Sequence, residues 1–445
     1  MKLATLSIAA LALTLPSLLA SPSRDGAAAV DVFPNGNPLT TASGRRLIEG
    51  DIMAEDEQSD LTGRKSISDM DRYWPNGEVV YAYHPSVSES YKTVIEAAMD
   101  HWRQHTCLTF RQRRPDDVHF VIFRSDGDGC SSQLGRVPEK SRLGQNISIA
   151  AGCGSVHIAV QEIGHAVGFL HEQMRSDRDQ HIIILSNNVI PEQLFNFERL
   201  ADNNHGIPYD LTSVMQYGYD AFSRKPYEKS TMVTVDPALQ RLLTGNHLLS
   251  FRDRLLANRM YRCSRWCDSR ANATCLNGGY ARRVTSGNEI DGQSCGCDCP
   301  PNFRGARCEH KIRDNYYEDL PCGGKITKPG NIETPGYPQR LAPFQSCMWD
   351  IKAPKGKKIA IRINGFGFAP RYDYPNHNLT KCVAESVEFR LKNQNIYDGD
   401  MYCGDDLAAG SELQSDGRRA VIIIRADDKL RGSGLSASVR FFKRR

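Results

Sequence analysis

The chain has 445 residues, which is more than one hydrophobic core usually organises, so we expect two or three folded units. The formal net charge is only +4 and no long basic run occurs, which argues against nucleic acid as the main partner. The 14 cysteines are an even number and allow up to seven disulfides.

Residues 1–20 have the pattern of a secretory signal peptide. Lys2 precedes an apolar run from Leu3 to Leu15, and small residues surround Ala20. A short signal anchor is the alternative, but no polar-free span of about 20 residues occurs here or later. We therefore expect a secreted, extracellular protein without a membrane span, in which the cysteines pair as disulfides.

Residues 21–65 are rich in Ala, Gly, Asp, Glu and Ser and show no sustained apolar period, which predicts a pro-segment or a flexible leader. At its end, Gly63-Arg64-Lys65-Ser66 offers a basic cleavage site.

Residues 66–264 have the pattern of a mixed α/β domain. Their Val and Tyr content predicts a short strand over Glu78–Tyr83. Apolar residues that recur at helical spacing predict an amphipathic helix from Ser88 to about His105. The run Val118–Phe123 predicts a strand that is either buried or at an edge.

The segment V-Q-E-I-G-H-A-V-G-F-L-H-E, residues 160–172, carries the main chemical signal. It differs at one residue from H-E-x-x-H-x-x-G-x-x-H, in which two His share a helix face, a Gly lets the chain turn and a third His closes a zinc site. Gln161 stands at the first His position and is followed by Glu162, His165 and His171. A lone His or Glu on a helix is more often structural, but this longer string is far more specific.

A second motif, Ser213-Val214-Met215-Gln216-Tyr217-Gly218, follows downstream. By itself it would indicate a buried turn with an aromatic plug. Together with the 160–172 string and Arg175-Ser176-Asp177-Arg178-Asp179, it resembles the astacin family of secreted zinc endopeptidases, which have a two-lobed metzincin fold. The resemblance implies that Met215 lies under the metal in a tight turn. It also implies that Tyr217 contacts the zinc and moves to stabilise the transition state.

The resemblance further implies one bound Zn²⁺ and an extracellular protein or peptide as the substrate. His165, His171 and, less well, Gln161 would be the metal ligands. Glu162 would take a proton from a zinc-bound water and give it to the leaving amine.

Activation is also implied by the resemblance. Ile48-Glu49-Gly50-Asp51-Ile52 is similar to the family's F-x-G-D motif, with Ile48 in place of Phe. In the family that Asp occupies the open position of the zinc and keeps the zymogen inactive, whereas the alternative here is a plain Gly-Asp turn. Cleavage near Lys65 would free a new N-terminus, which in the family is buried close to the residue corresponding to Glu172.

Four cysteines of this domain match those of the family. The sequence alone leaves three connectivities open. The resemblance implies the pairs Cys107–Cys263 and Cys130–Cys153.

Gln161 departs from the family pattern. Its amide oxygen is a poorer donor to zinc than imidazole and reaches a different distance from the backbone. Zinc would then be held by His165, His171 and Tyr217, with Gln161 Oε1 as a weak fourth ligand. His157 lies one turn earlier on the same helix face, but it is displaced by about 6 Å along the axis and fits a helix-start residue better.

Residues 265–309 resemble an EGF-like module, whose small core depends on three disulfides. Zinc binding by these cysteines is the alternative, but the C-x-C-x-C spacing and the secreted context favour disulfides. The six cysteines are Cys267, Cys275, Cys295, Cys297, Cys299 and Cys308.

Residues 322–442 resemble a CUB domain, an all-β sandwich. The resemblance rests on residues 330–338 and 347–354, and alternating runs such as Lys358–Ile363 and Ala420–Arg425 fit it. It implies the bridges Cys322–Cys347 and Cys382–Cys403, and some CUB domains bind calcium, although no acidic trio can be assigned here. Glycosylation sequons occur at Asn146, Asn272 and Asn378.

The predicted fold class is therefore α+β: a two-lobed protease domain, a disulfide-rich EGF-like module and a CUB sandwich. Three functions follow. The first is a secreted zinc endopeptidase, made as a zymogen. The second is a catalytically impaired, protease-like protein that grips extended peptides. In the third, the EGF-like and CUB modules bind a matrix or protein partner and the protease domain is a scaffold.

Overall fold

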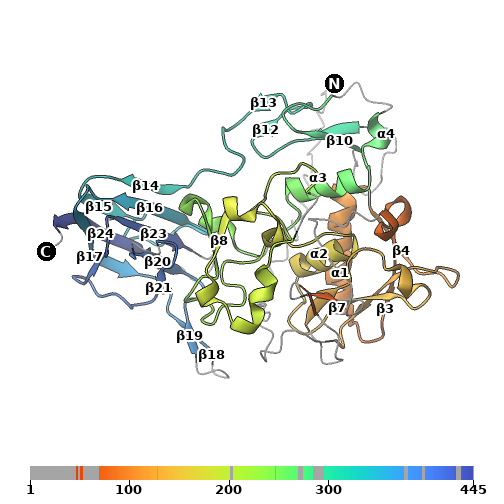
Figure 1. Ribbon diagram of the computed structural model, residues 1–445, viewed down its shortest axis with the longest axis horizontal. Helices are drawn as coiled ribbons and strands as arrows, with labels where there is room; N and C mark the ends of the chain where they lie inside the picture. Colours follow the sequence, from red (N-terminus) through yellow and green to blue (C-terminus); the bar gives the residue numbers. More distant parts are fainter. Residues whose placement is uncertain are drawn as a thin grey trace, which may run out of the picture.

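The computed structural model describes residues 47–48, 51–53, 70–127, 129–200, 204–245, 247–268, 274–283, 295–374, 379–392, 396–426 and 432–443. The expected signal peptide, the Arg64-Lys65 cleavage site and the sequons at Asn272 and Asn378 lie outside these residues, whereas Asn146 is half-buried in a strand. Within the described part of the chain, every helix is too short or too polar to span a lipid bilayer. The fold is mixed, with helices in the first half and sheets towards the C-terminus (Figure 1).

A sheet and two helices form the first lobe, residues 47–166. The strand order is β1-β2-β6-β7-β5-β3-β4, and β6 is antiparallel to β7. The predicted strand and first helix agree with the structure, in which β3 spans Glu78–Tyr83 and α1 spans Glu89–His105. The other strands are β1 (Leu47–Ile48), β2 (Ile52–Met53), β4 (Thr109–Gln112), β5 (Val121–Arg124), β6 (Cys130–Ser132) and β7 (Gln145–Ile149).

The expectation for the run Val118–Phe123 is confirmed in its buried alternative, although the strand starts later than predicted. The strand β5 begins only at Val121, and it pairs with β7 on one side and β3 on the other. The strand β5 is therefore an interior strand of the sheet. The strand β6 lies between β7 and the short N-terminal strand β2, which pairs with β6 in parallel register.

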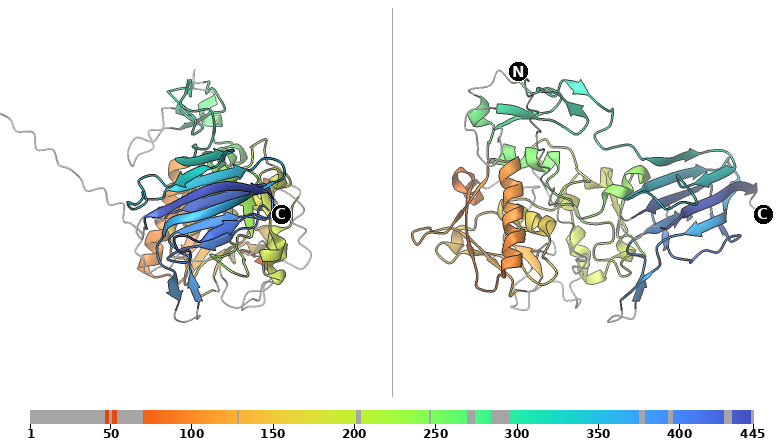
Figure 2. Two further views of the ribbon diagram at one scale, coloured as in Figure 1. Left: turned by 90° about the vertical axis from the view of Figure 1, so that its left-hand side faces the viewer. Right: turned by 180° about the vertical axis from the view of Figure 1, so that it is seen from behind.

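Helix α1 packs on α2 (Val156–Ala166), and both cover the sheet, as the view from behind in Figure 2 shows for α1. Trp102 on α1 is fully buried and donates its indole N–H to the carbonyl of Val160 on α2, at 3.1 Å. This contact fixes the helix that carries the 160–172 motif against the core of the lobe.

The second lobe, residues 167–268, has little regular structure and its own apolar core, which includes Phe197, Tyr217 and Phe222. Its regular elements are η4 (Glu172–Met174), η5 (Arg178–Gln180), η6 (Ser186–Asn188), η7 (Pro191–Phe197), η8 (Pro237–Leu242), β8 (Ile182–Ile184), β9 (Met232–Thr234), α3 (Phe251–Met260) and α4 (Arg265–Asp268). The structure joins Cys107 to Cys263 and Cys130 to Cys153, the pairs implied by the resemblance.

Residues 265–311 form what we call the disulfide module, with hairpins β10–β11 (Tyr280–Arg283, Cys295–Asp298) and β12–β13 (Phe303–Arg304, His310–Lys311). It rests on α3, since the ring of Tyr280 lies 5.7 Å from that of Phe251 and Arg254 Nε lies 3.3 Å from Asp298 Oδ2. The chain after it returns to the second lobe, where Tyr317 Oη accepts a hydrogen bond from Leu211 N at 2.9 Å. Its disulfides are Cys267–Cys295, Cys275–Cys297 and Cys299–Cys308.

Residues 322–443 form a β-sandwich of two sheets, ordered β14-β16-β23-β20-β21 and β15-β24-β17-β22. Alternating apolar residues from both sheets fill its core. The two bridges are Cys322–Cys347 and Cys382–Cys403, again the implied pairs. The strands are β14 (Cys322–Ile326), β15 (Gly330–Glu333), β16 (Ser346–Lys352), β17 (Lys357–Gly367), β18 (Tyr372–Tyr374), β19 (Leu379–Lys381), β20 (Ser386–Arg390), β21 (Asp400–Tyr402), β22 (Glu412–Gln414), β23 (Arg419–Arg425) and β24 (Gly434–Lys443).

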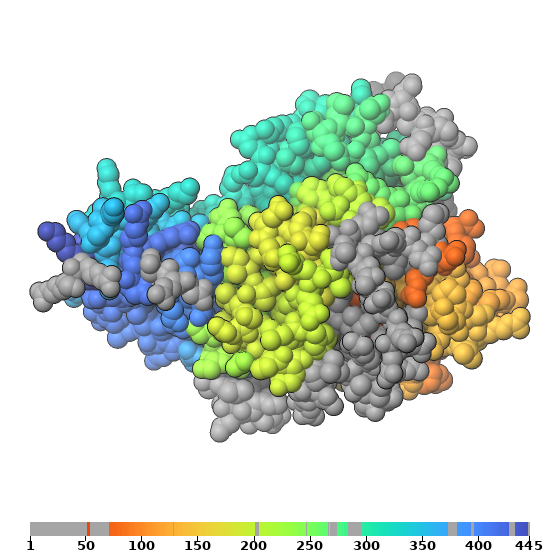
Figure 3. All heavy atoms as spheres, viewed as in Figure 1, coloured from red at the N-terminus to blue at the C-terminus, as the bar shows by residue number. Residues whose placement is uncertain are grey.

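The sandwich is docked on the second lobe, and the two share a continuous surface in Figure 3. Three apolar residues of the first sheet, Met348, Val421 and Ile423, cluster with Ala238 of η8. Polar contacts join the same surfaces, because Lys229 Nζ lies 2.6 Å from Asp400 Oδ1 and Arg390 Nη2 donates to Gln240 Oε1 at 3.1 Å.

Candidate metal centre

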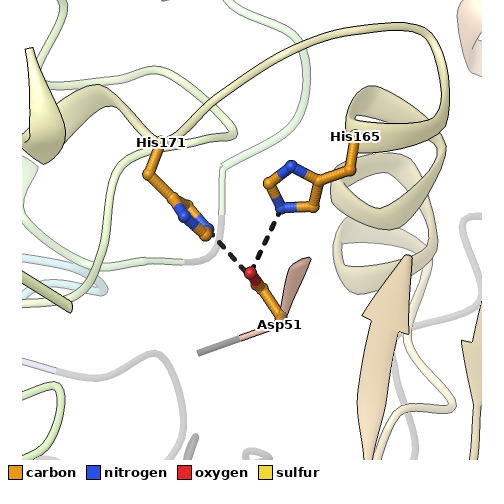
Figure 4. Close-up of side chains that lie close together, drawn as sticks. All are labelled: Asp51, His165 and His171. Carbon is orange, nitrogen blue, oxygen red and sulfur yellow. Dashed lines mark ion pairs between the residues drawn. The ribbon is translucent and has the colours of Figure 1, made fainter. Parts of the chain in front are cut away.

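Helix α2 carries Gln161, Glu162 and His165 and ends just after them. Gly168 takes φ of 104°, a left-handed conformation that glycine adopts without strain, and its amide bonds to His165 O at 2.8 Å. The chain then turns back, so that His171 from the following loop faces His165 from the helix (Figure 4). The spacing in the sequence thus brings the two predicted imidazoles together.

Both imidazoles are fully buried, and their ring centroids lie 4.7 Å apart. His165 Nδ1 lies 2.8 Å from Phe169 O. A carbonyl can only accept, so Nδ1 carries the hydrogen and Nε2 of the neutral ring presents a lone pair. Among the described residues, this Nε2 has no hydrogen-bond partner. An oriented, buried and unused nitrogen of this kind is what a metal site requires.

Asp51 reaches this pair of histidines from the N-terminal segment (Figure 4). Its Oδ1 lies 3.4 Å from His165 Nε2 and its Oδ2 lies 3.2 Å from His171 Nε2. Burial by itself would raise the pKa of Asp51, but when His171 and His165 are protonated their charges outweigh burial and hold the pKa well below its usual range. The carboxyl is therefore ionised at neutral pH.

Gln161 faces the same carboxylate. Its Nε2 donates to Asp51 Oδ2 at 2.8 Å and lies 3.3 Å from His171 Nε2. The amide thus presents hydrogens to the site, whereas the ligand role expected for Gln161 requires Oε1. A half-turn of the amide would exchange the two atoms and break the bond to Asp51.

Two distances between donor atoms are compatible with zinc, and the donor atoms of Asp51, His165 and His171 all lie within 4.8 Å of one another. Ligands placed about 2.0–2.1 Å from a tetrahedral centre are separated by about 3.3–3.4 Å. The two separations between Asp51 and the histidines, 3.4 and 3.2 Å, are close to that value. Among the described residues, the group that could hold an ion here consists of Asp51, His165 and His171, so His157 is not brought to it. A second group contains Cys382 and Cys403, but their sulfurs form a disulfide.

Met215 lies against helix α2, and Tyr217 lies beside His171. The carbonyl of Met215 accepts from Glu172 N at 2.9 Å, and its sulfur lies 3.0 Å from the place a Cβ on Gly164 would occupy. Glycine at position 164 therefore lets α2 approach the Met215 turn closely. The ring of Tyr217 lies 4.4 Å from the ring of His171.

Two residues that support this turn were not predicted from the sequence. Asp253 on α3 accepts from Ser213 Oγ at 2.6 Å and from Val214 N at 2.8 Å. Gln173 Oε1 accepts from Tyr217 N at 3.2 Å. Neither contact has a local signal, because both join residues that are far apart along the chain.

The two glutamates of the motif are buried, with exposures of 1% for Glu162 and 0% for Glu172. Glu172 Oε1 accepts from Asp210 N at 2.6 Å and lies 3.4 Å from Arg175 Nη1. The N-terminus expected to form near residue 66 lies outside the described residues, so its contact with Glu172 stays a prediction.

Two family profiles match the sequence: Astacin (Peptidase family M12A) over residues 66–262 and the CUB domain over residues 322–439. Blastula protease 10 of Paracentrotus lividus is 31% identical over 416 residues, which cover 88% of this chain and 64% of that protein. Zinc metalloproteinase dpy-31 of Teladorsagia circumcincta is 32% identical over 383 residues, covering 80% and 58%. The chain thus spans less than two thirds of the length of these curated relatives.

A solved structure is also similar. High choriolytic enzyme 1, a hatching enzyme zinc-protease from Oryzias latipes, is 32% identical with a TM-score of 0.39, over 47% of this chain and 99% of that chain.

Proposed function

Because the chain belongs to the astacin family of peptidases and carries a CUB domain, we propose that it is a secreted zinc endopeptidase, made as an inactive precursor, that hydrolyses peptide bonds in extracellular proteins. The observation that carries the proposal is the convergence of His165, His171 and Asp51, with separations of 3.2–3.4 Å that suit zinc. The seven disulfides support an oxidising, extracellular location.

His165 and His171 would hold one zinc ion, joined by Asp51 in the precursor, and Gln161 would at most be a weak further ligand. When bound, zinc supplies a Lewis acid and lowers the pKa of water. Glu162 then accepts a proton from the attacking water and returns it to the leaving amine. The hydroxyl of Tyr217 donates a hydrogen bond to the oxyanion that develops on the substrate carbonyl.

Activation would require removal of the segment that carries Asp51. This segment occupies the outer side of β6, where Ser132 N donates to Asp51 O at 2.9 Å. Cleavage near Lys65 would release both the carboxylate and the strand edge, and an extended substrate would then pair with β6.

The second candidate is a protease-like binding protein, and Gln161 favours it. Gln161 replaces an imidazole that would bind the metal directly, and even the loss of a residue that only supports a metal ligand weakens metal affinity by about 10- to 100-fold. In this case the protein acts by binding a peptide at the site, or a matrix or protein partner through the EGF-like module and the CUB domain.

One experiment separates the two functions. The secreted chain is cleaved near Lys65, bound zinc is measured by elemental analysis, and hydrolysis of a denatured protein is followed beside it. Stoichiometric zinc, with hydrolysis that Glu162→Ala removes, supports the peptidase. Absence of both zinc and hydrolysis, with both restored in Gln161→His, supports the binding protein.

A further inference from the structure

We propose that Gln161 makes this site a metal-independent receptor for an extended peptide that contains an aspartate followed by a branched aliphatic residue. The residues Asp51-Ile52 of the same chain are the occupant seen in the structure. The inference deepens the second candidate function above and does not depend on hydrolysis. It rests on hydrogen bonding to the peptide carboxylate, on backbone pairing and on an apolar contact.

The amide of Gln161 is the part of the site that distinguishes it from a pure metal centre. Its Nε2 donates to Asp51 Oδ2 at 2.8 Å, which is shorter than the 3.4 and 3.2 Å that separate this carboxylate from His165 Nε2 and His171 Nε2. A neutral imidazole carries one hydrogen and in a metal site presents its lone pair inward, whereas a glutamine amide always carries two hydrogens. Gln161 therefore offers a donor to a carboxylate whether or not zinc is present.

The backbone of the occupant is also held. Ser132 N on β6 donates to Asp51 O at 2.9 Å, and Ile52 pairs with Ser132 in parallel register. An incoming strand that adds to an exposed sheet edge gains affinity from its main chain, and alternate side chains supply the specificity. Here the Asp51 side chain contacts the histidines, whereas the Ile52 side chain packs in a separate apolar cluster.

Ile52 occupies an apolar site of its own. It is 1% exposed and clusters with Leu134 and Leu170, against which Tyr73 and Leu200 also pack. A fully buried side chain of this size contributes substantially to binding, and a hydroxyl or a charge would be left without a partner there. The two adjacent subsites thus select an acidic residue followed by an aliphatic one.

The test uses the activated full-length chain, cleaved near Lys65 and separated from the released segment by gel filtration, with its mass verified. A fluorescent peptide with the sequence of residues 47–53 is titrated in EDTA, and binding is measured by anisotropy. We expect saturable binding in EDTA that weakens at least tenfold for the peptide with Asp51→Asn and about tenfold for Ile52→Ala.

Protein variants complete the test. Gln161→Leu is expected to weaken the peptide at least tenfold, whereas the matched control Gln104→Leu, at an exposed position of α1, leaves affinity unchanged. The inference is overturned if the peptide binds without EDTA but not in its presence. It is also overturned if the peptide with Asp51→Asn binds as tightly as the unchanged peptide, or if the Gln161→Leu and Gln104→Leu proteins bind the peptide equally tightly. Hydrolysis of a denatured protein with added zinc is scored separately, so failure of the peptidase proposal leaves this result unaffected.

Discussion

The carboxylate of Glu388 lies between two guanidiniums at the surface where the sandwich meets the second lobe. Arg390 Nε donates to its Oε1 at 2.6 Å and Arg425 Nη2 donates to its Oε2 at 3.0 Å. Burial would raise the pKa of Glu388, but the charges of Arg390 and Arg425 lower it, so the group is ionised at neutral pH. Glu388 is 1% exposed and Arg390 is 0% exposed.

Replacing Glu388 by Gln preserves its shape but leaves the two cations without the negative charge they share. Breaking a buried ion pair by removing one partner costs about 3–5 kcal/mol, and we expect the lower end because the Gln oxygen still accepts one hydrogen bond. Since Arg390 also donates to Gln240, part of the loss should appear in η8 of the second lobe.

Hydrogen exchange followed by mass spectrometry suits this measurement, because a chain with several domains does not unfold in one step. Glu388→Gln should lower the opening free energy of peptides covering β20 and β23 by about 3 kcal/mol and should also reduce protection of residues 237–242. The matched control is Glu412→Gln, whose partner Arg440 lies at 2.8 Å but is 56% exposed, so its effect should be at most about 1 kcal/mol. Equal effects of the two variants would refute the reasoning.

Three further outcomes are expected. Gly164→Val should lower the opening free energy of helix α2 in hydrogen exchange by about 1–3 kcal/mol, because the new side chain meets the Met215 sulfur at 3.0 Å, and Gly164→Ala should cost less. Burial and the charge of His247 lower the pKa of His157 to about 4. The free energy of unfolding should therefore fall by at most about 3 kcal/mol as the pH falls from about 6.5 towards 4, because the unfolded chain then binds a proton that the folded chain does not. If His157→Gln shows the same dependence of unfolding free energy on pH as the unchanged protein, this explanation is wrong. Replacing Cys107 and Cys263 by Ala opens a loop of 156 residues and should cost about 5 kcal/mol, a value that calorimetry of the double variant can check.

Local sequence patterns correctly predicted those structural elements whose formation depends on residues that are close together in the sequence. The helix beginning after Ser88 and the strand Glu78–Tyr83 have the expected bounds, since their periodicity and cap lie within a few residues. Likewise, the spacing of His165 and His171 around Gly168 determined that both imidazoles meet.

Local sequence patterns could not predict the order in which the strands pair or the direction in which side chains point. The run Val118–Phe123 is apolar whether it lies inside a sheet or at its edge, so composition could not decide that β5 lies between β7 and β3. The direction of the Gln161 amide depends on Asp51, which lies 110 residues away along the chain. Asp253 was missed for the same reason, because its partners are within hydrogen-bond distance in space but 39 and 40 residues away in sequence.

The two attachments of the disulfide module have a mechanical consequence. The module follows Cys263, which is bonded to Cys107 of the first lobe, and the chain after the module contacts the second lobe at Tyr317, whose hydroxyl lies 2.9 Å from Leu211 N. Both ends of the module are therefore anchored to the two lobes. Tension applied to the sandwich would be borne first by its direct contacts with the second lobe, which include Lys229–Asp400 and Arg390–Gln240, before it reached the module. The lobe that carries Tyr217 would bear that force directly.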